Sequence, residues 1–132
     1  MAARQGDLSH YNSCNVLSLH ALLGAYSDEG AQWLDELRPV LADNIRYACD
    51  FIAAHFPGVQ VMQPQGTYML FLDCAAWLQE HHMTLRELEE RGARAGVIWQ
   101  DGAAFAWPDS IRMNLALPHS RLVEAMERLR VH

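Results

Sequence analysis

The sequence contains no lysine. All ten of its basic residues are arginine, and they are scattered from Arg4 to Arg130. Chemistry that needs a lysine amine therefore cannot occur on this chain. The formal net charge of −6 also argues against a general nucleic-acid or anionic-membrane binder, because phosphate affinity comes mainly from clustered Lys and Arg.

Long apolar runs and cysteine pairs are missing as well. No run approaches the roughly 18 residues of a membrane span, and the first dozen residues lack the apolar segment of a signal peptide. We therefore expect a soluble, cytoplasmic protein. The three cysteines are Cys14, Cys49 and Cys74, and their wide spacing favours reduced thiols over disulfides or a zinc site.

The 132 residues, 51% of them hydrophobic, suffice for one compact domain with a core. Apolar residues recur every three or four positions between residues 16 and 26, which predicts a helix. The stretch Ser27-Asp-Glu-Gly30 then supplies a break with an N-cap candidate for a second helix, whose apolar stripe runs over residues 34–56. Pro39 is expected to bend or divide that helix.

The remainder of the chain alternates strands with helices. The predicted elements are strands at 59–62, 67–73, 97–99 and 111–115, a helix that begins at the capping box Thr84-Leu-Arg-Glu87 and ends near residues 92–96, and a last helix capped by Ser120. This order predicts an α+β fold in which a small, largely antiparallel sheet packs on helices and two helices precede it.

Arg112 stands in the otherwise apolar stretch SIRMNLAL. Because side chains alternate along a strand, Arg112 shares one face with Ser110 and Asn114, whereas Ile111 and Met113 form the core face. The polar face either simply meets water or contacts a ligand. In the second case, an arginine beside an amide presents a fork of donors that suits a carboxylate.

Several other residues have an ordinary structural explanation. Gly66 marks either a close approach to a ligand or only the turn between two strands. The His81-His82 pair lacks further metal ligands at a matching spacing and is better explained as a solvated loop. The loop aromatics Trp99, Phe105 and Trp107 are explained first by core or interface packing and second by a pocket wall.

Taken together, the motifs resemble the C-terminal part of the fold-type I pyridoxal-phosphate-dependent aminotransferases. The similarity is nearest to the branch of cystathionine β-lyase-like carbon-sulfur lyases. The motifs that carry it are, in this order, Tyr11-Asn12 with Asn15-Val16, Trp33-Leu-Asp35, Pro64-Gln-Gly-Thr-Tyr68 with Leu72-Asp73, Gly102-Ala-Ala-Phe105, and Arg112-Met-Asn-Leu-Ala-Leu-Pro118 followed by Leu122-x-Glu-Ala125. The loop departs from the family's Pro-Gly-x-x-Phe-Gly pattern at Asp101 and Ala106.

The resemblance implies that residues 1–30 are a remnant of a large domain and that residues 31–132 form the small C-terminal domain. It also implies a preceding cofactor domain that holds pyridoxal phosphate on its own lysine, and a homodimeric complete enzyme. We then expect neither catalytic nor cofactor-binding nor metal-binding residues in this chain, and no cofactor bound to it alone. The residues expected to bind the amino-acid substrate are Arg112, Asn114, Tyr68 and Gly66, with Arg112 gripping the α-carboxylate.

A non-enzymatic small-ligand-binding or interaction module explains the sheet and the acidic charge equally well. A weaker option is a structural subunit that assembles through the aromatic loop. An upstream coding segment with a lysine-bearing cofactor domain would favour the enzyme over both.

Overall fold

The computed structural model describes residues 15–131, which divide into one unit that ends at Arg38 and a second that begins at Pro39. The first unit contains helix α1 (Val16–Ala25) and the start of helix α2 (Asp28–His55). Asn15 caps α1 by accepting a hydrogen bond from Ser18 N at 2.8 Å. The Ser27 hydroxyl accepts one from Gly30 N at 3.1 Å, which confirms Ser27 as the cap of α2.

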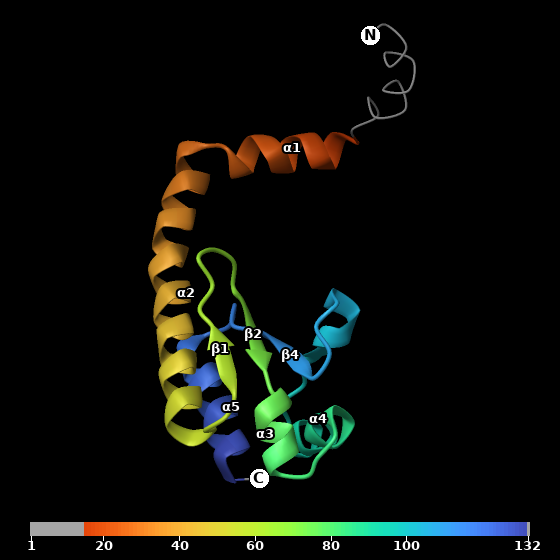
Figure 1. The fold of residues 1–132 in the computed structure, drawn as a ribbon. Helices are drawn as coiled ribbons and strands as arrows, with labels where there is room; N and C mark the ends of the chain where they lie inside the picture. Colours follow the sequence, from red (N-terminus) through yellow and green to blue (C-terminus); the bar gives the residue numbers. More distant parts are fainter. Residues whose placement is uncertain (1–14, 132) are drawn as a thin grey trace, which may run out of the picture. The chain divides into compact units, whose positions relative to one another are not determined.

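Helix α2 continues through Pro39 as a single helix, so of the two expected outcomes, a bend or a division, the division is wrong (Figure 1). Proline lacks the N–H of one intrahelical hydrogen bond, and the helix nevertheless runs past this position to His55. From Pro39 onward the helix turns its apolar stripe inward, with Ala48, Phe51 and Ile52 buried.

The second unit is built on a four-stranded antiparallel sheet with the strand order β1-β2-β4-β3. The strands are β1 (Gln60–Met62), β2 (Met69–Asp73), β3 (Gln100–Asp101) and β4 (Ser110–Asn114). The helices are the later part of α2, α3 (Ala75–Glu80), α4 (Leu85–Arg94) and α5 (His119–Val131), with a 3-10 turn, η2 (Gly102–Phe105), before β4. The predicted α+β fold is confirmed.

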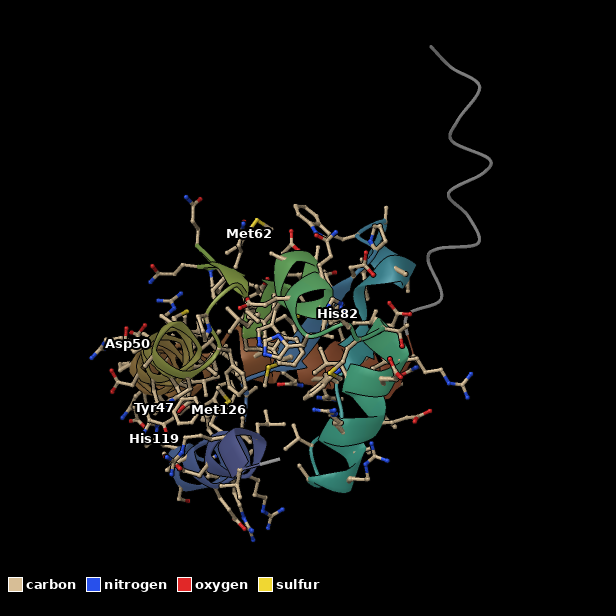
Figure 2. The ribbon with its side chains drawn as sticks, turned by 60° about the horizontal axis from the view of Figure 1, so that its bottom comes forward. Tyr47, Asp50, Met62, His82, His119 and Met126 are labelled. Carbon is tan, nitrogen blue, oxygen red and sulfur yellow. The ribbon has the colours of Figure 1, made fainter. Side chains whose placement is uncertain are left out.

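The core lies between one face of the sheet and the helices. Its buried strand residues are Leu70, Leu72, Ile111 and Met113, and they pack with Ile52 of α2, Leu78 of α3 and Met126 of α5. Figure 2 shows α2 and α5 next to each other, with Met62 on the other side of the sheet from Met126. One sheet face is therefore covered by helices, and the second face carries the alternate strand side chains, which include Phe71 and Arg112.

Two local predictions need correction, and one helix was missed. Residues 97–99 form no strand, because Val97 N bonds to Gly92 O (2.8 Å) at the end of α4 and pairing with β4 starts only at Gln100. Helix α5 begins at His119 and not after Ser120, since the Pro118 carbonyl accepts the first helical hydrogen bonds. Helix α3 was not predicted at all.

The capping box is confirmed. Thr84 and Glu87 exchange hydrogen bonds at the start of α4, and the helix ends at Arg94, before Gly96 at φ +78°. None of the helices within residues 15–131 is both long enough and apolar enough to cross a membrane. Cys14 and the Tyr11-Asn12 motif lie outside the described residues.

Candidate functional site

The open face of the sheet is organised around Arg112, in the middle of β4. Arg112 lies opposite Phe71 of β2 on one side and opposite Gln100 of β3 on the other. Because directly opposed residues of antiparallel strands share a face, the three side chains form one row across the sheet. Met62, opposite Phe71, extends this row to β1.

Two contacts fix the guanidinium group of Arg112. Its Nη1 donates a hydrogen bond to Gln100 Oε1 at 3.0 Å. Its Cζ lies 4.5 Å from the centroid of the Phe105 ring, which is cation–π distance. The Phe105 ring in turn meets the Phe71 ring edge-on, with centroids 5.8 Å apart and planes at 89°. A half-buried arginine is thus held by a neutral amide and an aromatic face.

No carboxylate of the described residues lies within ion-pair distance of Arg112. The arginines that do form ion pairs there are Arg38, Arg46, Arg86, Arg121, Arg128 and Arg130. The positive charge of Arg112 therefore has no anionic partner among residues 15–131, although the group is held in one place. An anion that reached this face would meet a fixed cation.

Asn114 is the predicted site residue that lies on the same strand as Arg112. Asn114 is on the same face of β4 as Arg112, is exposed, and accepts a hydrogen bond from Ala116 N at 2.8 Å through its Oδ1. Its amide nitrogen has no hydrogen-bond partner among the described residues. Asn114 can therefore offer a donor beside Arg112.

Tyr68 and Gly66 belong to the connection between β1 and β2. The Tyr68 carbonyl accepts a hydrogen bond from Leu115 N (2.9 Å), which places its backbone beside the end of β4, and its side chain is 44% exposed. A side chain at Gly66 would have open space around it. The positive φ of this turn, +79°, is at Thr67 and not at Gly66. Nothing in the turn itself therefore demands a glycine at position 66.

The loop after β3 has a defined local structure at the two positions that depart from the family pattern. Asp101 caps η2 by accepting a hydrogen bond from Ala103 N at 2.7 Å. Ala106 adopts φ +60°, the left-handed conformation that a glycine takes most readily. Gly102 is packed so closely that an added Cβ would lie 1.8 Å from Ser110 Oγ, so its small size serves the contact with β4.

The remaining candidates have structural roles. His81 stacks on Trp77 with centroids 4.0 Å apart, and the structure presents no group of three or more metal-binding side chains within residues 15–131. Trp99 lies against Gly92 of α4, where an added Cβ would meet its ring at 2.3 Å. Burial and the neighbouring Asp73 and Asp109 raise the pKa of the Cys74 thiol to about 12, which makes it a poor nucleophile.

Gln100 and Phe71 were not found from the sequence. Both are recognised only through strand register, and the predicted strand at 97–99 stopped one residue before Gln100. Phe105 was part of a motif without an assigned contact. Knowledge of the strand register, which places Gln100 and Phe71 opposite Arg112, is what reveals this row of side chains.

Over residues 4–129 the sequence matches the family described as Aminotransferase class I and II. The chain belongs to this family. The resemblance seen in the motifs is therefore confirmed.

Individual family members support the same branch. Protein MalY of Escherichia coli strain K12 is 33% identical over 122 residues, which are 89% of this chain and 30% of MalY. Cystathionine beta-lyase PatB of Bacillus subtilis strain 168 is 28% identical over 119 residues, 88% of this chain and 30% of PatB. The chain thus spans about 30% of the length of these curated relatives.

The fold agrees with solved structures of the family. Cystalysin from Treponema denticola, whose crystal structure contains pyridoxal 5'-phosphate, superposes with a TM-score of 0.76 at 28% identity. The alignment covers 89% of this chain and 29% of cystalysin. The sheet and helices described above are therefore a recurrent part of larger proteins of this family.

Proposed function

We propose that this chain is the part of a pyridoxal-phosphate-dependent enzyme that binds the α-carboxylate of an amino-acid substrate. The reaction is transamination or β-elimination at a carbon-sulfur bond. The proposal is supported by the family, by relatives named as cystathionine β-lyases, and by the geometry of Arg112.

The observation that carries the proposal is the fixed and unneutralised guanidinium of Arg112. A carboxylate bound by two parallel N–H donors is both attracted and oriented, which a single point charge cannot achieve. Orientation matters for a reacting amino acid, because correct placement of the bond to be broken lowers the barrier. Asn114 on the same face, and Tyr68, whose backbone lies at the end of β4, are the further residues we assign to substrate binding.

Pyridoxal phosphate, when bound, acts as an electron sink for bond breaking at the substrate. This chain has no lysine to carry it, and none of the described residues is assigned to hold it. We assign the cofactor to a preceding domain of the complete enzyme. The chain described here contributes the binding and orientation of the substrate, and without that domain we expect no catalysis.

We also propose that residues 1–30 belong to the large domain and that residues 31–132 form the small domain, a boundary that lies inside α2 and before the end of the first compact unit at Arg38. Every residue of α1 is exposed, and its leucines point to several sides, with Leu17 82% and Leu22 54% accessible. A helix that is apolar all round is normally buried in a larger protein. The homodimeric state of the complete enzyme and its cytoplasmic location stay predictions.

The test is the substitution Arg112→Ala in the complete, cofactor-loaded enzyme. Loss of a desolvated carboxylate clamp costs about 2 to 5 kcal/mol, so kcat/KM for an L-amino acid substrate should fall on the order of 30- to 5,000-fold. Steady-state kinetics with an S-alkylcysteine and with an aminotransferase substrate measures this loss and identifies the reaction branch.

Arg94→Ala is the matched control. Arg94 is an exposed arginine at the end of α4, so its substitution removes the same positive charge at a place away from the site. It should change kcat/KM less than about twofold. An Arg112→Ala enzyme as active as the Arg94→Ala enzyme would contradict the proposed clamp.

A further inference from the structure

Gln100 is the only polar side chain among the described residues that hydrogen-bonds to Arg112, and it takes a specific part of the guanidinium. The bond goes to Nη1. The opposite edge, formed by Nε–H and one Nη2–H, keeps both of its parallel donors. This edge is one of the two on a guanidinium that can bind a carboxylate bidentately.

The chemistry of Gln100 is as informative as its place. A glutamate in the same position would form an ion pair with Arg112 and neutralise the charge that a substrate needs. A glutamine accepts the same hydrogen bond without adding negative charge. The Phe105 ring, 4.5 Å from Cζ, holds the guanidinium from one face and likewise adds no net charge.

We propose that Gln100 is a positioning residue that holds Arg112 through Nη1, so that the Nε/Nη2 edge is presented, with its charge intact, to the substrate carboxylate. This inference rests on the proposed function of Arg112. It specifies that the Nε/Nη2 edge of the guanidinium binds the substrate, and it explains why the neighbour on β3, Gln100, carries no charge.

Two substitutions separate the parts of this role. Gln100→Glu keeps the size and the acceptor but adds a competing carboxylate, and we expect KM for an α-amino acid to rise at least tenfold with kcat changed less than threefold. Gln100→Met keeps the approximate shape without an acceptor, and we expect KM to rise about three- to tenfold, because the guanidinium is no longer held in one orientation.

The matched control is Gln60→Glu. Gln60 lies on the same sheet face, at β1, opposite Asp73 and two strands away from Arg112. It receives the same charge change and should leave KM within about twofold of the unsubstituted enzyme. Circular dichroism of all variants checks that their folds are alike.

A binding measurement that does not depend on turnover completes the test. Butyrate has a carboxylate but no amine, so its dissociation constant from the complete enzyme reports the clamp alone. Calorimetry should show at least tenfold weaker binding to the Gln100→Glu enzyme and an unchanged constant for Gln60→Glu.

The outcomes distinguish this inference from the proposed function. If Arg112→Ala weakens substrate and butyrate binding but both Gln100 variants behave like Gln60→Glu, the role of Gln100 is refuted and the clamp stands. If Arg112→Ala itself has no effect, both are refuted. A Gln100→Glu enzyme with tenfold weaker binding and near-normal kcat, together with a weaker effect of Gln100→Met, supports the inference.

Discussion

Asn44 joins helix α2 to the chain that directly follows β4, and its removal should destabilise the second unit markedly. The side chain is completely buried. Its Nδ2 donates to Leu115 O and to Leu117 O, both at 2.9 Å, and its Oδ1 is 2.9 Å from His119 Nδ1. One amide therefore uses both of its donors and its acceptor, as buried polar groups generally must.

The cost of Asn44→Ala follows from what each partner loses. Leu117 O loses its donor altogether, which costs about 1 to 3 kcal/mol. Leu115 O keeps the hydrogen bond from Leu117 N at 3.0 Å, so it loses only one of two, or about 1 kcal/mol. The exposed His119 ring can turn to water. The sum is a loss of about 2 to 4 kcal/mol in the free energy of unfolding.

A urea titration followed by circular dichroism measures this difference. With a urea slope of about 1 to 3 kcal/mol/M, a loss of about 2 to 4 kcal/mol lowers the midpoint by about 0.7 to 4 M. His119→Ala is the comparison variant: it leaves both carbonyls satisfied, but it removes the partner of the buried Asn44 Oδ1, at about 1 to 3 kcal/mol, and the ring contact with Tyr47 (5.2 Å; Figure 2).

Asn44→Asp adds a test of direction. An aspartate can still face His119, but it offers no donor and turns oxygen toward two carbonyls, so it should be at least as destabilising as alanine. An Asn44→Ala loss below about 1 kcal/mol would refute the reasoning.

Two further predictions concern the loop and the buried thiol. Ala106→Gly should stabilise the protein by up to about 1 kcal/mol, because a non-glycine residue at φ +60° costs about 1 to 2 kcal/mol and the chain entropy of glycine offsets part of this gain. Thermal melting measures the change in stability, with Ala104→Gly in the same turn as the control. A lower melting temperature for Ala106→Gly would contradict the prediction. Cys74, with its pKa raised to about 12, should have only about one thiolate in 10⁴ at pH 8 and should alkylate far more slowly in the folded protein than in urea. Because burial raises this pKa, the neutral Cys74 thiol contributes stability that is complete below about pH 8.5 and declines as the pH rises toward 12. Peptide mapping after iodoacetamide treatment measures the reactivity of the thiol. Equal labelling in native buffer and in urea would contradict the burial argument.

The elements with a local signal were predicted well from the sequence. The capping box at Thr84 depends only on residues three positions apart, and the alternation around Arg112 depends only on the strand itself. Ile111 and Met113 are buried as expected, whereas Asn114 is exposed. Ser110 is buried despite its place on the polar face, because its hydroxyl donates to Trp107 O at 2.7 Å.

The features that depend on contacts between distant segments could not be predicted in this way. Residues 97–99 have the composition of a strand, but Ile98 is 88% exposed and the ladder with β4 begins only at Gln100. The first residue of α5 depends on Pro118 and on the contact between His119 and Asn44, 75 positions away. Arg112 was recognised, whereas its partner Gln100 required the register.

The orientation of Arg112 follows from how the loop before β4 is attached. Gly102 begins the loop in close contact with Ser110, and the Ser110 hydroxyl holds Trp107 near its end. Both ends are therefore attached to the strand two residues before Arg112, so the Phe105 ring between them is carried at a fixed place over the guanidinium. At the two positions that depart from the family pattern, Asp101 caps the 3-10 turn through its side chain and Ala106 takes a left-handed conformation. The loop and Gln100 then act on the same group, and a change in either should reach the substrate through Arg112.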